Sequence, residues 1–192
     1  MTSPSLPDWV FPPPQGFVAE DLDHIPDLPA HTELIDGSLV FVSPQRDFHT
    51  SVLFLLQTGL RNAAPEGYRV RREIGVKLGP RQRPEPDLIV LGPGAVIRNS
   101  ATFYEAEDVT LAIEVVSPES VVRDRKRKPV LYAEAGIPHF WRVEEREDAA
   151  VVYVYELDPA TNTYFHTGIH HTKLKVDVPF PIDVDLTEID TI

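Results

Sequence analysis

Two apolar runs that each carry a single carboxylate constrain the fold of this chain more than any other feature. The first is Pro86–Leu91 (PDLIVL) and the second is Leu111–Val116 (LAIEVV). Runs of this length and composition predict buried β-strands. A carboxylate on a buried strand is costly unless it is hydrogen-bonded, paired with a cation or bound to a metal. The pattern therefore predicts neighbouring strands whose carboxylates, Asp87 and Glu114, converge at one edge of a sheet.

Length and composition indicate one globular domain. The chain has 192 residues, of which 42% are hydrophobic and 25% charged, which is enough for a single full core. No apolar run approaches the roughly 20 residues that a membrane helix requires. The N-terminus has no basic segment followed by an apolar one, so we expect no secretory signal and a cytoplasmic location. Because cysteine is absent, any metal must be held by oxygen or imidazole ligands.

The net charge of −12 argues against a general nucleic-acid binder, because phosphate affinity comes mainly from lysine and arginine. The basic residues are nevertheless concentrated: 12 of the 18 lie in two segments, Arg61–Arg83 and Arg123–Lys128, that flank the acidic strands. Either these segments form a basic patch on an acidic body, or they are solvated faces. For a patch, the candidate contacts to nucleic acid are Arg71, Arg72, Arg123 and Arg125.

The first half of the chain predicts an arm, a hairpin, a helix and a strand. Residues 1–30 are rich in proline and predict an extended arm packed through Trp9, Phe11 and Phe17. Two short apolar runs around Asp36-Gly37 predict a hairpin, because this turn needs positive φ at both central residues. Apolar spacing predicts a helix over 44–64 that starts near Ser43 or Asp47. Alternation then predicts a strand over 68–78.

The second half predicts more strands around one helix. A loop rich in glycine and proline is expected over 92–100. Ser117–Ser120 predicts a turn and helix entry, and the helix that follows is expected to run to about Ala135 and to end at Gly136. Strands follow at 140–143 and 150–157, and those at 164–169 and 173–178 suggest a hairpin or edge pair. The expected architecture is an α+β or α/β domain, residues 31–192, built around a mixed sheet.

The acidic strands predict chemistry with a divalent metal. Carboxylate oxygens suit Mg²⁺ or Mn²⁺, and the carbonyl of Val115 is a further candidate ligand. Such an ion lowers the pKa of a bound water and offsets charge on a phosphate. Lys128 is the candidate to stabilise the oxyanion, because Asp124, Lys128 and Tyr132 follow an i, i+4, i+8 spacing on one helical face.

Simpler interpretations of the same residues remain open. Asp87 follows a proline, where a turn or cap role is common, and Glu114 has Arg72 or Lys128 as alternative ion-pair partners. Pro129 fits the helix only if the helix kinks or begins near it. Glu33 is a candidate third carboxylate, whereas Asp36 is interpreted as a turn residue. His49 on the first helix either reaches the site or is an ordinary buried or exposed histidine. The cluster of His166, His170 and His171 is interpreted as surface, because adjacent strand residues face opposite sides.

An ordered set of motifs between Glu33 and Leu157, roughly two thirds of the chain, resembles a known family. The motifs are Glu33–Gly37 (ELIDG), Ser43-Pro44 with His49, Pro86-Asp87, Ile113–Pro118 (IEVVSP), Arg123–Lys128 (RDRKRK), and Tyr132–Pro138 (YAEAGIP) with Trp141. They resemble the Uma-two family, whose members are inferred restriction endonucleases of the PD-(D/E)XK nuclease superfamily.

The resemblance implies a restriction-endonuclease-like core with a divalent metal at its acidic edge. It implies that Asp87 and Glu114 are the metal carboxylates and that Glu33 is a supporting acid. The usual lysine of the superfamily lies two residues after the second acid, where this chain has Val116. In the family a lysine on the following helix is thought to substitute, and this position falls on Lys128.

The leading hypothesis is a Mg²⁺-dependent DNA endonuclease. A homodimer is expected, because cutting both strands needs two sites or two encounters. One rival is a catalytically inactive nuclease-fold protein that binds nucleic acid or a protein partner. A second is a structural module whose β-rich C-terminus forms an interface.

Overall fold

The computed structural model describes residues 7–42 and 44–192. Its elements in chain order are η1 (Asp8–Val10), η2 (Ala19–Asp23), β1 (Glu33–Ile35), β2 (Ser38–Val40), α1 (Asp47–Ala63), β3 (Arg69–Arg72), β4 (Gly75–Lys77), β5 (Leu88–Leu91), β6 (Phe103–Glu105), η3 (Ala106–Asp108), β7 (Val109–Val115), η4 (Arg123–Arg127), α2 (Lys128–Glu134), β8 (His139–Arg146), β9 (Ala149–Asp158), β10 (Thr163–His170), β11 (Lys173–Val176), β12 (Ile182–Asp185) and η5 (Leu186–Thr191). None of the helices in this described part is long and apolar enough to cross a membrane.

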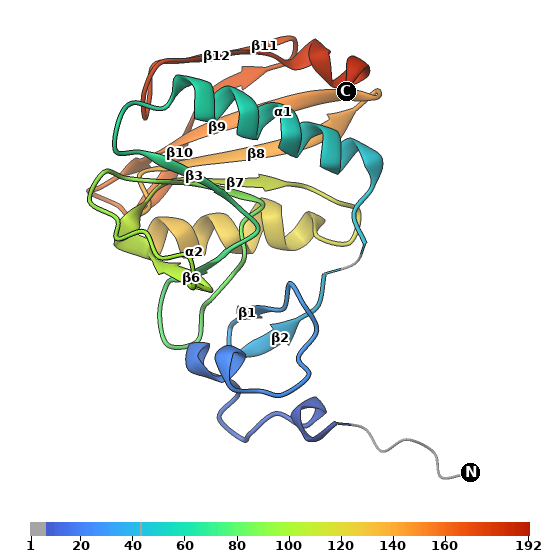
Figure 1. Ribbon diagram of the computed structural model, residues 1–192, viewed down its shortest axis with the longest axis vertical. Helices are drawn as coiled ribbons and strands as arrows, with labels where there is room; N and C mark the ends of the chain where they lie inside the picture. The colour runs from blue at the N-terminus through green and yellow to red at the C-terminus, as the bar shows by residue number, and fades with distance from the viewer. Residues whose placement is uncertain (1–6, 43) are drawn as a thin grey trace.

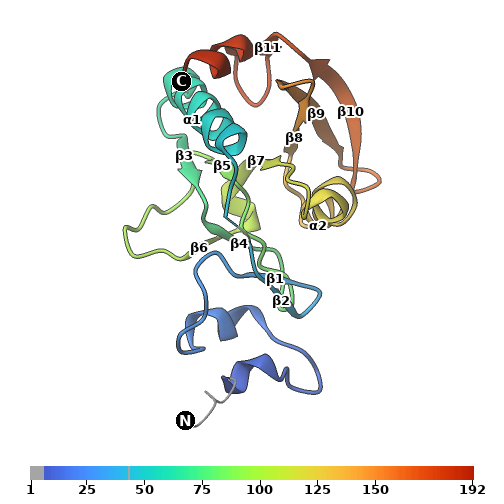
Figure 2. The ribbon, with the colours of Figure 1, turned by 90° about the vertical axis from the view of Figure 1, so that its right-hand side faces the viewer.

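A six-stranded sheet in the order β10-β9-β8-β7-β5-β3 forms the centre of the protein (Figures 1 and 2). β7 and β8 run parallel, whereas the other neighbouring strands are antiparallel. Figure 1 shows α1 and the β11–β12 hairpin on one side of this sheet and α2 on the other. The expected α+β class with a mixed central sheet is therefore confirmed.

The two faces of the sheet bury alternate side chains of the acidic strands. Leu88, Val90, Leu111 and Ile113 belong to the core beneath α1, whereas Ile89, Leu91 and Ala112 belong to the core on the α2 side. Because side chains alternate along a strand, this pattern places Glu114 of β7 on the α2 side. Asp87 lies just before β5, where its carboxylate reaches His49 of α1. The continuous apolar runs in the sequence reflect burial on both faces.

The hairpin and the first helix follow their sequence signals. β1 pairs with β2 across Asp36 and Gly37, whose φ angles of 55° and 76° match the turn that the sequence predicts. α1 begins at Asp47 and buries one stripe of apolar side chains that includes Val52, Leu56 and Leu60. The alternative start, Ser43, lies outside the described residues.

The helix expected after the turn at Ser117–Ser120 has an unexpected local form. Residues Arg123–Arg127 form a π-helical turn, and α2 continues from Lys128 to Glu134. Pro129 lies in the first turn of α2, where its missing N–H is tolerated because the preceding turn is wide. Gly136, at φ 80°, ends the helix as the sequence predicts.

Two strand predictions were wrong, and two strands were missed. The segment 68–78 is two strands, because the chain turns at Glu73 (φ 48°): β3 joins the central sheet, and β4 pairs with β6 in a separate sheet. β10 and β11 are not partners, since β10 pairs with β9 and β11 pairs with β12. Strands β6 and β12 were not anticipated. Alternation identifies a strand but carries no information about its partner.

The arm is packed in its described part. Phe17 and Ala19 are buried against Leu34 of β1, and the rings of Trp9 and Phe41 lie 5.7 Å apart. Phe11 is 69% exposed, so the prediction that it anchors the arm was wrong. The division of the chain at residue 30 stays a prediction.

Candidate active site

Asp87 and Glu114 lie at the same end of two adjacent strands. Leu88 of β5 is paired with Ile113 of β7 in antiparallel register, so the next position along pairs Asp87 with Glu114. The backbone N–H of Val115 donates a hydrogen bond to Asp87 Oδ2 at 2.6 Å. The structure therefore brings the two carboxylates together as the sequence predicts, and the Val115 N–H fixes the first of them.

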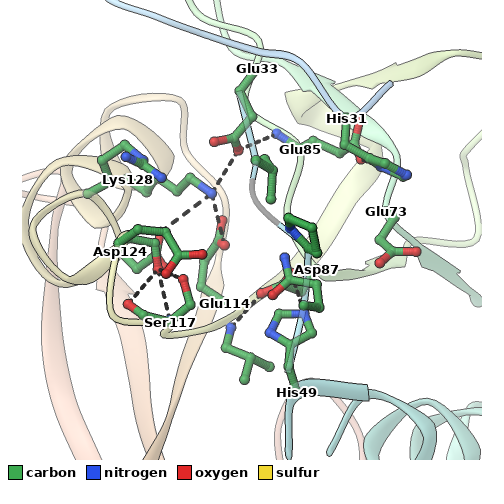
Figure 3. Close-up of a pocket in the computed structure, with 17 residues that line it drawn as sticks. His31, Glu33, His49, Glu73, Glu85, Asp87, Glu114, Ser117, Asp124 and Lys128 are labelled. Atoms are coloured by element: carbon green, nitrogen blue, oxygen red, sulfur yellow. Dashed lines mark hydrogen bonds and ion pairs between the residues drawn. The ribbon is translucent and has the colours of Figure 1, made fainter. Parts of the chain in front are cut away.

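Lys128 is buried among carboxylates that come from three different elements (Figure 3). Its Nζ lies 2.7 Å from Glu33 Oε1, 2.9 Å from Glu114 Oε2 and 3.5 Å from Asp124 Oδ1. The hydroxyl of Tyr132 donates a hydrogen bond to the other oxygen of Glu114. The face shared by Asp124, Lys128 and Tyr132 is thus directed at Glu114. Of the simpler interpretations of Glu114, the Lys128 pair is present, whereas Arg72 instead pairs with Glu73 at 3.0 Å.

The buried cluster has more negative than positive charge. Burial raises the pKa of Glu114, as do the neighbouring carboxylates of Asp124, Asp87 and Glu33, and Lys128 only partly opposes this. Burial likewise raises the pKa of Asp124. Burial disfavours the ammonium of Lys128, but the surrounding carboxylates, led by Glu114 and Glu33, outweigh it and hold the pKa of Lys128 well above its usual value. The cluster therefore keeps Lys128 charged and favours a proton on a carboxyl group.

His49 projects from the first turn of α1 to Asp87. Its Nε2 lies 3.1 Å from Asp87 Oδ1, although the two groups are not aligned as a hydrogen bond and the ring has no other hydrogen-bond partner among the described residues. The His49 side chain is 5% exposed and that of Asp87 is 14% exposed. Of the two open interpretations of His49, the structure favours the one in which it reaches the site.

These side chains line a cavity of about 340 Å³. Its wall also contains three residues that were not predicted from the sequence: His31, Glu73 and Glu85. His31 Nδ1 lies 2.5 Å from Glu85 Oε1; burial raises the pKa of Glu85, and Glu85 raises the pKa of His31. Glu85 precedes Asp87 by two residues, so an extended alternation would have placed it on the same face. No sequence signal pointed to the other two.

The donor atoms of this cavity suit a hard divalent cation. Among the residues that the structure describes, no three His, Asp or Glu side chains are grouped so as to hold a metal. Mg²⁺ is commonly bound by only one or two carboxylates, with waters and substrate phosphate completing its shell. Asp87 and Glu114 would supply that number of ligands, and a cation between them would offset the excess negative charge.

The four arginines that were predicted to contact nucleic acid do not lie together. Arg123 lines the cavity. Arg125 does not; its Nε and a terminal nitrogen bind the carboxylate of Glu144 at 2.8 and 2.6 Å. Arg71 and Arg72 lie on β3, outside the cavity. His166 and His171 are exposed, as the sequence analysis expected.

The fold and the site together define an α+β protein with a central mixed sheet, two carboxylates at the ends of adjacent strands, and a lysine on the flanking helix. The chain belongs to the Uma2 family, described as "Putative restriction endonuclease", whose model matches residues 19–187. The family named by the motif resemblance is thereby confirmed.

A solved structure supports the same fold. It comes from Anabaena variabilis ATCC 29413 and is described as a "putative nuclease belonging to DUF820". The match has a TM-score of 0.64 and 14% sequence identity, and it covers 91% of this chain and 98% of that one. No curated protein matches the chain. At this identity the likeness concerns the fold alone.

Proposed function

We propose that the protein is a divalent-metal-dependent endonuclease that hydrolyses phosphodiester bonds of DNA. The observation that carries this proposal is the placement of Asp87 and Glu114 opposite each other, with the ammonium of Lys128 at 2.9 Å from Glu114. The family and the related fold, both described in the terms of nucleases, add to it.

Each of these residues would have a distinct role in hydrolysis. Asp87, Glu114 and the carbonyl of Val115 would hold Mg²⁺ or Mn²⁺, which when bound supplies a more acidic water and offsets phosphate charge. The ammonium of Lys128 would stabilise the charge that develops on the phosphate oxygens. Glu33 and Asp124 position this ammonium, and Tyr132 orients the Glu114 carboxylate.

Cleavage of supercoiled plasmid with Mg²⁺ or Mn²⁺ tests the proposal. We expect Asp87→Asn and Glu114→Gln each to reduce the cleavage rate by at least about 100-fold, since loss of even an outer-shell partner costs about 10–100-fold in metal affinity or activity. Glu107→Gln, at an exposed carboxylate outside the cavity, is the matched control. Cleavage by Asp87→Asn at the wild-type rate would refute the assignment.

Calorimetry separates metal binding from turnover. We expect Mg²⁺ or Mn²⁺ to bind the wild type and not the Asp87→Ala/Glu114→Ala variant. Absence of binding to the wild type, even with Mn²⁺, would favour an inactive protein.

A catalytically inactive nuclease fold that binds nucleic acid or a protein partner is the second candidate. Three carboxylates engage Lys128, and Val116 stands where the superfamily usually has its lysine. Tight DNA binding without metal-dependent turnover would favour this candidate. We also propose a homodimer, for which sedimentation is the test.

A further inference from the structure

A second hollow, of about 570 Å³, lies between the C-terminal end of α1 and strand β3. Four arginines, Arg61, Arg69, Arg71 and Arg72, line it together with a single acidic residue, Glu66. This excess of positive charge is opposite in sign to the acidic cavity of the candidate active site and to the chain as a whole, whose net charge is −12. We call this hollow the arginine groove.

Three of these arginines have unused hydrogen-bonding capacity. Arg72 pairs with Glu73, whereas Arg61, Arg69 and Arg71 have no ion pair among the residues that the structure describes. Arg69 donates to the Tyr68 carbonyl at 2.7 Å, and Arg71 donates to the Val70 carbonyl at 3.0 Å. These contacts use one of the five N–H donors of each guanidinium and leave the others for a ligand.

β3 connects the arginine groove to the candidate active site. It forms the edge of the central sheet opposite β10 (Figure 2), and the residue that follows it, Glu73, lines the acidic cavity and donates its N–H to the Asp87 carbonyl at 3.1 Å. At about 3.3 Å per residue, Arg69 lies roughly 13 Å along the strand from Glu73. This length corresponds to about four base-pair steps of B-DNA.

We propose that the arginine groove binds the phosphate backbone of duplex DNA beside the cleavage site. The inference rests on the proposed function for the identity of its ligand, and it assigns affinity to Arg61, Arg69 and Arg71. The acidic cavity would repel phosphate in the absence of a cation, so the groove supplies the attraction that the cavity does not. Contacts of this kind position the duplex and carry no sequence preference.

The test is fluorescence anisotropy with a labelled DNA duplex of arbitrary sequence, in EDTA, over a salt series. Each phosphate contact contributes about 0.9 to the slope of log K against log salt. We expect each single Arg→Ala variant to reduce the slope by about 1. Between 50 and 200 mM salt the wild type should therefore lose about 40-fold more affinity than Arg61→Ala/Arg69→Ala/Arg71→Ala. Arg61→Lys/Arg69→Lys/Arg71→Lys, which keeps the charges, should bind nearly as well as the wild type.

Lys175→Ala is the control, because it removes an exposed charge on β11, away from the groove. Single variants keep the test valid if the triple variant does not fold. Two results would overturn the inference: wild-type slopes in all arginine variants, or no duplex binding by the wild type at 50 mM salt. If the arginines only stabilise the end of α1 or protect an edge strand, the slopes should stay at the wild-type value.

Plasmid cleavage with Mn²⁺, run in parallel, distinguishes the two proposals. Arginine-dependent binding without cleavage would refute the proposed function and leave the inference standing. Cleavage that is equally efficient in the wild type and the triple variant at limiting DNA would refute the inference and leave the function standing.

Discussion

Replacing Lys128 with methionine tests the electrostatic description of the buried cluster. Lys128 is 4% exposed and contacts Glu33, Glu114 and Asp124. Methionine preserves much of the volume and removes the charge. Because three buried carboxylates cannot all stay ionised without a cation, one further carboxyl group must take up a proton in the folded variant.

The expected loss of folding stability equals the free energy needed to keep that carboxyl group protonated. A glutamate in the unfolded chain has a pKa of about 4.3, so holding one more proton costs about 3.7 kcal/mol at pH 7 and about 1 kcal/mol at pH 5. A carboxyl group whose folded pKa is raised contributes stability that is complete below its unfolded pKa and is lost as the pH rises toward its folded pKa. The deficit of Lys128→Met relative to the wild type should therefore grow from pH 5 to pH 7.

Urea denaturation at the two pH values measures this deficit. At pH 7 it corresponds to a decrease in Tm of about 10 °C for a chain of this length. Lys126→Met is the matched control, since Lys126 lies on the same helical segment and is exposed. A deficit below about 1 kcal/mol at pH 7, or one that is equal at both pH values, would refute the reasoning.

Three further substitutions probe single contacts, each by urea denaturation. Tyr132→Phe removes the hydroxyl that donates to Glu114 and should destabilise the fold by about 1–3 kcal/mol, because a buried acceptor loses its partner; an unchanged midpoint would contradict that contact. Glu144→Gln should cost about 1.5–3 kcal/mol, because it weakens charged hydrogen bonds to arginines that are themselves partly exposed. Although burial alone would raise the pKa of Glu144, the surrounding arginines lower it, so the cost should shrink as the pH falls below about 4.3. Asp36→Asn should cost less than about 1 kcal/mol, because the Asp36 side chain that pairs with Arg127 is half exposed. Hydrogen bonding to Arg127 lowers the pKa of Asp36 to about 2, so that this stabilisation, present above the unfolded pKa, should disappear as the pH falls toward about 2.

Local sequence signals predicted the elements better than their partners. The turn at Asp36-Gly37 and the helix end at Gly136 were found because each depends on the conformation of one or two residues. The break at Glu73 was missed, because a glutamate with positive φ gives no signal in composition. β11 was paired with the wrong strand, since its true partner β12 is chosen by packing on α1.

The site was predictable where it depends on strand ends and helical spacing. Asp87 and Glu114 were found because carboxylates are conspicuous in apolar runs. The contact between Lys128 and Glu33 was not derivable from spacing, because it joins a hairpin to a helix 95 positions later in the chain. Arg125 was expected to be available for nucleic acid, but it pairs with Glu144 on β8. This pairing could not be predicted, because it depends on tertiary structure.

The place of the lysine explains why the hairpin matters to the site. A lysine at Val116 would be attached to the end of β7 alone, whereas Lys128 contacts β1 through Glu33 and β7 through Glu114. The position of its ammonium therefore depends on how the hairpin packs against the helix. Arg127, the residue before Lys128, forms two hydrogen bonds to Asp36 at the tip of that hairpin. The turn residue thus fixes the hairpin to the helix that carries the lysine, and a substitution there should displace the ammonium even though Asp36 does not line the cavity.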